Sequence, residues 1–184
     1  DYRWMVPPLE AARVESFRGL AASVHADLAA RRKAGSLPFY DLPLQDVSAI
    51  ERYAAERRGS FDDLVVLGIG GSSLGLLAVN AALRTPFPRL EPVPRLTVLD
   101  NIDPVRVSSL LGALDPRRTL VNVITKSGDT AETMSAFLVF RRWLEDRLGA
   151  RAVREHLVVT TDAARGALRK IAADGGLAAF TVPD

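Results

Sequence analysis

Hydrophobic and polar residues follow two different patterns along this chain, one before and one after residue 60. Over residues 9–33 the apolar side chains recur at intervals of three and four: Val14, Phe17, Leu20, Ala21, Val24 and Leu28. This spacing places them on one face of a helix, which Gly35 then ends. A second helix is expected over residues 45–58, before Gly59. Residues 1–60 are therefore predicted to form an N-terminal flank of two helices.

From residue 61 onward, short apolar runs alternate with helical stretches. The runs are residues 64–67, 96–99, 120–124, 157–159 and 178–182, and the helices between them are expected at 74–83, from Asp103 and Pro104 onward, at 130–148 and at 162–173. Continuous apolar strands separated by helices are typical of a parallel sheet that is covered on both faces. Right-handed crossovers then favour an α/β fold, a three-layer doubly wound sandwich with a five-stranded parallel sheet over residues 61–184.

The loop after the first predicted strand is rich in glycine. Its sequence is Gly68-Ile69-Gly70-Gly71-Ser72-Ser73-Leu74-Gly75, and it opens a helix. Glycines let the backbone turn tightly and let a ligand approach closely, and the first N–H groups of the helix favour an anion. Ser72 and Ser73 add hydroxyl donors. The simpler alternative is a tight turn from strand to helix, with a serine as the helix cap.

Two well-known glycine motifs compete for this loop. A nucleotide-binding P-loop needs Lys and then Ser or Thr after its last glycine, but Gly75 is followed by two leucines. A dinucleotide-binding fingerprint fits better, because Gly68 and Gly70 match its first glycines and Asp100 ends the next strand. Its third glycine is replaced by Ser73. The dinucleotide reading therefore remains an alternative.

The loop after the third predicted strand carries three hydroxyls, a cation and a glycine within six residues. Its sequence is Thr125-Lys126-Ser127-Gly128-Asp129-Thr130. A phosphate monoester carries about −1.5 to −2 charges and three acceptor oxygens, which these donors complement. In a 2-1-3-4-5 strand order, the loops after strands 1 and 3 flank the point where the order reverses. Both loops are expected to converge there on one phosphate.

Part of the second loop has an alternative explanation in helix capping. Asp129 followed by Glu132 has the spacing of a capping box, with Asp in place of the usual Ser or Thr. Capping does not account for Lys126 and the neighbouring hydroxyls. Asp129 would repel a phosphate unless its side chain turns back onto the backbone.

Composition excludes several other classes of function. The 184 residues carry a net charge of only +2, which does not indicate nucleic-acid binding. The chain has no cysteine, and its two histidines, His25 and His156, are isolated, so thiol chemistry and a zinc site are not expected. Its longest apolar run, residues 64–71, is too short to span a membrane. A soluble protein of the reducing cytoplasm is expected.

The two loops, with Asp100-Asn101-Ile102-Asp103-Pro104 between them, resemble the signature pair of the glucose-6-phosphate isomerases. The second loop is shared more widely among sugar isomerase (SIS) domains. The resemblance implies a sugar 6-phosphate, either glucose 6-phosphate or fructose 6-phosphate. Its phosphate would be held by Ser72, Thr125, Lys126, Ser127 and Thr130, with Gly71 and Gly128 allowing close approach. Thr125 stands where serine is usual in the family, and Asp129 where threonine or glycine is usual.

The family resemblance also implies what this chain lacks. The isomerisation, a step of glycolysis and gluconeogenesis, proceeds through an enediol with a glutamate as the base and with no metal or cofactor. The family glutamate, histidine, lysine and arginine would all follow residue 184, and neither His25 nor His156 matches the family histidine. That histidine comes from the partner subunit, so the whole enzyme is expected to be a homodimer. The chain alone is expected to bind substrate without converting it.

Two other kinds of function stay open at this point. A regulatory SIS domain would bind a sugar phosphate with no catalytic half encoded downstream. A dinucleotide-binding domain would bind NAD and would depend on Asp100.

Overall fold

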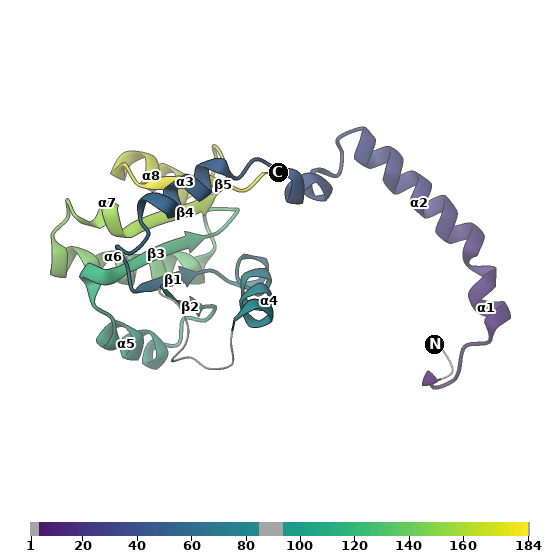
Figure 1. Cartoon of the computed structure of the whole chain (residues 1–184), viewed down its shortest axis with the longest axis horizontal. Coiled ribbons are helices and arrows are strands. Elements are labelled where there is room, and N and C mark those ends of the chain that lie inside the picture. The colour runs from purple at the N-terminus through teal and green to yellow at the C-terminus, as the bar shows by residue number, and fades with distance from the viewer. Residues whose placement is uncertain (1–3, 85–93, 184) are drawn as a thin grey trace. The chain divides into compact units, whose positions relative to one another are not determined.

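The computed structural model describes residues 4–84 and 94–183 (Figure 1). The chain divides into two compact units, one up to Gln45 and the other from Asp46 to Pro183. All five strands belong to the second unit.

The first unit is helical. It contains α1 (Ala11–Ser16), α2 (Arg18–Lys33) and the 3-10 helix η2 (Pro38–Leu44). The single helix predicted over residues 9–33 is interrupted at Phe17, so that part of the prediction is wrong in detail. Its end is confirmed, because Gly35 has a φ of +71°, a conformation that ends a helix and suits glycine. After this turn, Arg32 of α2 binds Asp41 of η2.

The second unit is a five-stranded, wholly parallel sheet with helices, as predicted. Its strands are β1 (Asp63–Leu67), β2 (Arg95–Leu99), β3 (Thr119–Ile124), β4 (Leu157–Thr161) and β5 (Ala178–Thr181). Its helices are α3 (Ser48–Glu56), η3 (Gly70–Ser72), α4 (Leu74–Leu83), α5 (Pro104–Ala113), η5 (Pro116–Arg118), α6 (Ala131–Leu148), α7 (Val153–His156) and α8 (Ala167–Gly175). The strand order is β2-β1-β3-β4-β5. The chain adds strands on one side of β1 first and then on the other, so the order reverses between β1 and β3 although all strands stay parallel. The carboxyl edge at that point is the expected place for a ligand.

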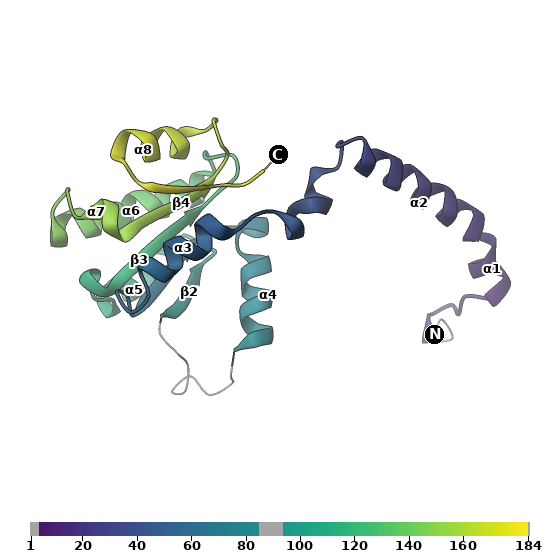
Figure 2. The same ribbon diagram turned by 45° about the horizontal axis from the view of Figure 1, so that its top comes forward.

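The main hydrophobic core lies between one face of the sheet and helices α5, α6 and α8. Its buried members include Val65, Leu67, Val121 and Val123 of the central strands, and Phe137, Phe140 and Leu144 of α6. Strand residues of the other parity, such as Val66 and Val158, are buried on the opposite face. There Tyr53 of α3 packs edge-on against Phe180 of β5, with ring centroids 5.3 Å apart. Figures 1 and 2 show α3 and α6 on opposite sides of the sheet.

Within the second unit, most element boundaries agree with the sequence pattern, but the start of α8 does not. Asp103 caps α5 as predicted, accepting a hydrogen bond from the Arg106 N–H at 2.8 Å. The helix predicted over 162–173 begins only at Ala167. The reason is that the Asp162 carboxylate accepts the N–H groups of Ala164 and Arg165, which makes a local turn and delays the helix.

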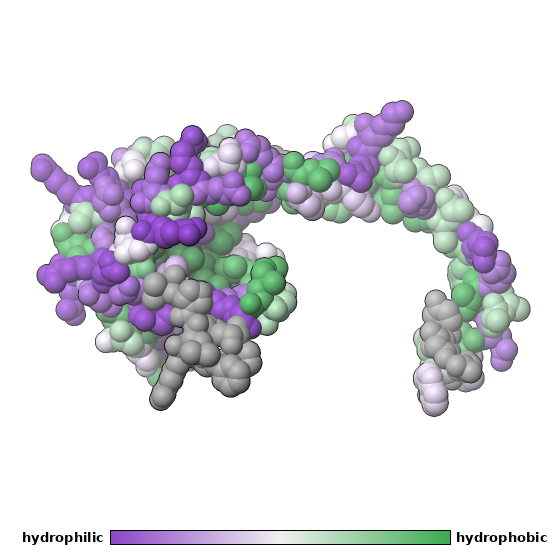
Figure 3. Space-filling view, viewed as in Figure 1, coloured by the Kyte–Doolittle hydropathy of each residue, from purple (hydrophilic) through white to green (hydrophobic). Residues whose placement is uncertain are grey.

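Helix α4 is hydrophobic around most of its circumference and yet stays largely exposed within this unit. Leu74 and Leu83 are 62% and 81% exposed, and Val79 is 56% exposed. Figure 3 shows the resulting hydrophobic patch over α4. No helix in the described parts of the chain is both long enough and apolar enough to cross a membrane.

Two neighbouring residues of α6 are expected to differ strongly in how much they contribute to the free energy of unfolding. Phe137 is completely buried whereas Leu138 is 56% exposed. We expect Phe137→Ala to lower the free energy of unfolding by about 3–5 kcal/mol, because it removes a buried ring and leaves a cavity. The matched control Leu138→Ala should cost less than about 1 kcal/mol. Urea unfolding followed by circular dichroism measures both; similar losses for the two variants would contradict this core.

Candidate functional site

The loops that follow β1 and β3 start side by side at the carboxyl edge of the sheet. Leu67 pairs with Val123 in the parallel register, so Gly68 lies at the level of Ile124. A Cβ atom at Gly68 would lie 3.0 Å from the Ser72 carbonyl oxygen and 3.2 Å from that of Ile124. Gly68 therefore lets the two loops approach each other, a role that differs from the close approach of a ligand expected for this glycine cluster.

The two serines of the first loop have different surroundings. Ser73 is fully buried, and its hydroxyl donates to the Gly70 carbonyl at 3.2 Å, which stabilises the turn into α4. The Ser72 hydroxyl makes no hydrogen bond within the described residues. Gly71 is exposed, and nothing lies within 4 Å of the position that its Cβ would occupy. Gly71 thus borders open space, Ser72 is half-buried with an unpaired hydroxyl among the described residues, and Ser73 is structural.

The second loop gathers its three hydroxyls into one cluster. The Thr125 and Thr130 oxygens are 2.9 Å apart, those of Thr125 and Ser127 are 3.3 Å apart, and those of Ser127 and Thr130 are 3.4 Å apart. Thr125 is almost completely buried, Thr130 is half-buried and Ser127 is exposed. The hydroxyl cluster (Thr125, Ser127 and Thr130) therefore runs from the core to the surface.

The hydroxyl cluster has hydrogen atoms that it can offer to an anion. Each hydroxyl has one donor hydrogen and two acceptor lone pairs. The Ser127 oxygen already accepts the N–H of Asp129 at 3.2 Å. Among the described contacts, the hydroxyl hydrogens have only the other hydroxyls of the cluster as acceptors. Rotation about the C–O bonds can redirect these hydrogens to a ligand oxygen.

Asp129 does not cap α6, which corrects the capping-box interpretation. Helix α6 begins at Ala131 with Thr130 as its N-cap residue, and it receives no side-chain cap. The Asp129 carboxylate instead accepts the N–H of Ala167, at the start of α8, at 2.9 Å. The side chain has therefore turned onto the backbone, which is the condition under which Asp129 is compatible with a phosphate. The backbone that it binds is that of α8 and not that of its own loop.

A third loop, between β4 and α8, packs against the second and was not predicted as part of the site. The Asp162 N–H donates to the Lys126 carbonyl at 3.2 Å, and the Leu168 N–H donates to the Gly128 carbonyl at 3.1 Å. Gly128 has a φ of +73°, and a Cβ atom there would lie 2.9 Å from the Gly166 Cα. The available sequence signal was Gly166 directly before the helix that became α8.

Asp162 fixes this third loop electrostatically as well as geometrically. Its pKa lies below the ordinary value, chiefly because the carboxylate accepts the Ala164 and Arg165 N–H groups and also because it pairs with the Arg165 guanidinium. The ionised carboxylate is therefore the form that the fold favours.

Asp100, the residue on which the dinucleotide alternative depends, is engaged by an arginine. The Arg106 guanidinium donates to the Asp100 carboxylate at 2.8 Å and to the Val98 carbonyl at 3.0 Å. A ribose would have to compete with this ion pair. This ion pair weighs against the dinucleotide alternative.

The histidines and the carboxylates do not form a metal centre in the described structure. His156 Nδ1 lies 2.9 Å from the Thr119 carbonyl oxygen, and its ring packs edge-on against Phe61, so this histidine is structural. His25 lies exposed on α2. Within residues 4–84 and 94–183, no three His, Asp or Glu side chains gather closely enough to hold a metal ion.

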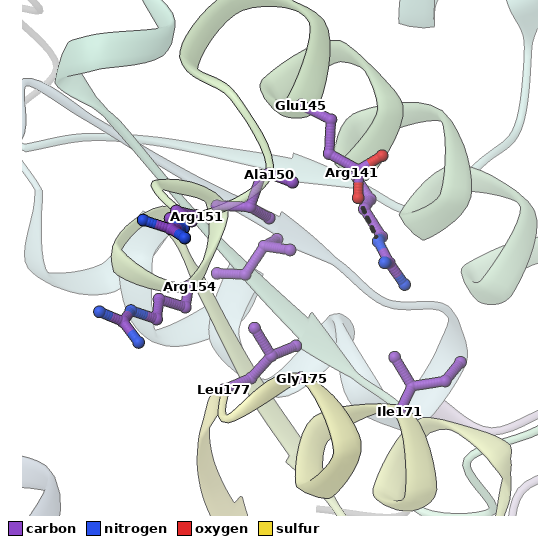
Figure 4. A pocket seen from close by; sticks show the side chains of 10 residues that line it. Arg141, Glu145, Ala150, Arg151, Arg154, Ile171, Gly175 and Leu177 are labelled. Atoms are coloured by element: carbon purple, nitrogen blue, oxygen red, sulfur yellow. Dashed lines mark hydrogen bonds and ion pairs between the residues drawn. The ribbon is translucent and has the colours of Figure 1, made fainter.

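A separate hollow of about 210 Å³ lies at the other end of the sheet (Figure 4). It is lined by residues around the ends of α6 and α8 and the start of β4: Arg141, Glu145, Ala150, Arg151, Val153, Arg154, Leu157, Ile171, Gly175 and Leu177. Arg141 is paired with Glu145 at 2.8 Å. Because the hollow is remote from the carboxyl edge, it is separate from the candidate site.

Comparison with known proteins identifies the family. A sequence model of phosphoglucose isomerase matches residues 47–175, a span that contains all three loops described above. The chain belongs to the phosphoglucose isomerase family.

Curated relatives agree with this family. The glucose-6-phosphate isomerase of Carboxydothermus hydrogenoformans is 40% identical over 180 residues, covering 94% of this chain and 39% of that protein. A glucose-6-phosphate isomerase of Thermus thermophilus is 43% identical over 159 residues, covering 85% and 36%. The chain thus spans about two fifths of the length of these relatives.

The fold of the chain is also found in crystal structures. A hypothetical protein from Thermus thermophilus matches with a TM-score of 0.74 and 39% identity, covering 92% of this chain and 42% of that one. A glucose-6-phosphate isomerase from Chlamydia trachomatis matches with a TM-score of 0.57 and 28% identity, covering 76% and 28%.

Gly68 and Gly71 are expected to respond differently to the same substitution. Gly68→Ala should lower the free energy of unfolding by about 1–3 kcal/mol, because the added methyl group meets backbone oxygens. Gly71→Ala should change stability by less than about 1 kcal/mol, since the methyl group enters open space and the φ is not positive. Chemical unfolding measures both variants. An equal loss for Gly71→Ala would contradict the geometry of the first loop.

Asp162 should contribute to stability in a pH-dependent way. Its pKa is lowered from 3.8 in the folded chain, so its stabilising contribution is present above about pH 3.8 and is lost as the pH falls through the lower folded value. Asp162→Asn, which does not titrate, should lack this component. Urea unfolding at neutral pH and at successively more acidic pH should show the difference between wild type and variant shrinking in acid. A constant difference would refute the assignment.

Proposed function

We propose that this chain supplies the part of a glucose-6-phosphate isomerase that binds the phosphate of the substrate. The observation that carries the proposal is the hydroxyl cluster, which lies beside the glycine loop at the carboxyl edge of the sheet. The names of the curated relatives support the activity, and a sugar 6-phosphate is the corresponding substrate class.

The site complements a phosphate in both charge and hydrogen bonding. Helices α4 and α6 begin at the two loops, so their first N–H groups and positive dipole ends lie at this edge. The exposed Lys126 adds a full positive charge. In this proposal Ser72, Ser127 and Thr130 donate to the phosphate oxygens, the buried Thr125 holds the other two hydroxyls of the cluster, and Gly71 and Gly128 leave room for the ligand.

The same loops cannot perform the isomerisation. Residues 68–75 and 125–130 contain no histidine or glutamate, and their one carboxylate, Asp129, is bound to the Ala167 N–H. Moving a proton between two carbons requires a base within hydrogen-bond reach of the carbon acid. We therefore propose, as the family resemblance implies, that the chain holds the substrate while groups elsewhere in the whole enzyme carry out the chemistry.

The remaining parts of the proposal rest on the family. A whole enzyme of this kind is proposed to act as a cytoplasmic homodimer, since the family histidine comes from the partner subunit. The regulatory SIS-domain alternative would share the same phosphate site and differ only in lacking the catalytic groups.

Lys126 provides the sharpest test of phosphate binding. We expect the 184-residue chain to bind fructose 6-phosphate measurably and fructose much more weakly. We expect Lys126→Ala to raise the Kd by about 10- to 100-fold, because a charged hydrogen bond contributes about 1.5–3 kcal/mol. Isothermal titration calorimetry measures these affinities. Lys33→Ala, which removes a positive charge from α2, is the matched control and should bind as the wild type does.

Two results would contradict the proposal. Equal affinity for fructose and fructose 6-phosphate would exclude a phosphate site. Conversion of fructose 6-phosphate to glucose 6-phosphate by the chain alone would show that it contains the catalytic groups.

A further inference from the structure

Asp129 lies in the second loop, but its side chain binds a residue outside that loop. Its carboxylate accepts the Ala167 N–H at the first residue of α8, at 2.9 Å. We propose that Asp129 is a positioning residue, which fixes the phosphate-binding hydroxyls by tying their loop to the start of α8. This inference rests on the proposed function, because it assigns a role at the same site.

The hydrogen-bonding pattern shows how the tie works. Two backbone hydrogen bonds already join the second loop to the third. The Asp162 N–H donates to the Lys126 carbonyl, and the Leu168 N–H donates to the Gly128 carbonyl. Asp129 adds a side-chain bond just beyond them. The second loop is therefore held to the connection between β4 and α8 along its length.

The hydrogen bond between Asp129 and Ala167 matters because Asp129 follows Gly128. A glycine is the residue with the greatest conformational freedom, and Gly128 immediately precedes Asp129. Asp129 is bound through its N–H, which donates to the Ser127 hydroxyl at 3.2 Å, and through its carboxylate, which binds Ala167. These two bonds fix the direction of the chain between Ser127 and Thr130. The hydroxyl oxygens of these two residues are 3.4 Å apart.

The position of the carboxylate also limits the cost of a negative charge in this loop. The N-terminus of α8 carries the positive end of the helix dipole, which favours a carboxylate there. An acceptor without charge would make the same hydrogen bond and would repel a phosphate less. Asp129 is thus expected to act through its hydrogen bond and not through its charge.

This distinction makes three variants informative. Asp129→Asn keeps an acceptor oxygen and removes the charge, so it should bind fructose 6-phosphate at least as tightly as the wild type. Asp129→Ala removes the acceptor and should raise the Kd by about tenfold, because a loop that is no longer tied to α8 must be ordered when the ligand binds. Ala167→Pro removes the N–H donor at the first helical position, where proline is tolerated, and should weaken binding similarly.

Asp103→Ala is the matched control. Asp103 accepts the Arg106 N–H at 2.8 Å at the start of α5, so this variant also removes an aspartate that binds a helix N-terminus. It should lose as much stability as Asp129→Ala and keep its affinity for fructose 6-phosphate. Calorimetry gives the Kd, thermal unfolding gives the stability, and amide hydrogen exchange at Ala167 reports the bond directly.

The expected results are weak binding by Asp129→Ala and Ala167→Pro, no further loss in the double variant, and full binding by Asp129→Asn. Three results would each overturn the role of Asp129 while leaving the proposed function intact. These are binding by Asp129→Ala within about twofold of wild type, equal weakness of the Asn and Ala variants, and a parallel loss in Asp103→Ala. Failure of the wild-type chain to bind fructose 6-phosphate or inorganic phosphate would overturn both.

Discussion

The parallel pairing of β1 with β3 is the interaction on which the rest of the second unit depends. It joins Leu67 to Val123, two fully buried residues, and it brings the two following loops to the same level of the sheet. The core on one face, formed with α6, holds the two strands in that register. Because the strand order reverses between them, neither crossover helix covers their carboxyl ends, and the loops can present polar groups there.

Close approach of backbone to backbone is the second constraint. Gly68 allows the first loop to lie against the end of β3, and Gly128 and Gly166 allow the second and third loops to touch. Both Gly128 and Gly166 have positive φ values, which other residues adopt only with strain. The close contacts between these loops thus depend on residues that have no side chains of their own.

In the proposed function, the candidate site binds the phosphate of the substrate, and its two loops contain no histidine or glutamate that could act as a base. The loops supply hydroxyls, helix N-termini and Lys126, which suit a phosphate, and the carboxylate of Asp129 is engaged by backbone. Such a division between holding the non-reacting part of a substrate and transforming the reacting part is common, because binding energy at a remote group can position the reacting one.

The exposed hydrophobic surface of α4 contrasts with the well-packed face on which α6 lies.

The fold class, the five strands, most of the helices between them and the positions of both candidate loops could be predicted from the sequence alone. This was possible because apolar periodicity and glycine or proline positions are local signals, and Leu74–Leu83 and the Asp103 cap were predicted correctly from them. Local signals failed at Asp129 and Asp162, both of which looked like helix starts. The folded chain was needed to see that Asp129 binds α8, that Asp162 forms a turn, and that a third loop supports the hydroxyl cluster. The ties between these loops depend on contacts between residues far apart in the chain, which no spacing within a single segment can encode.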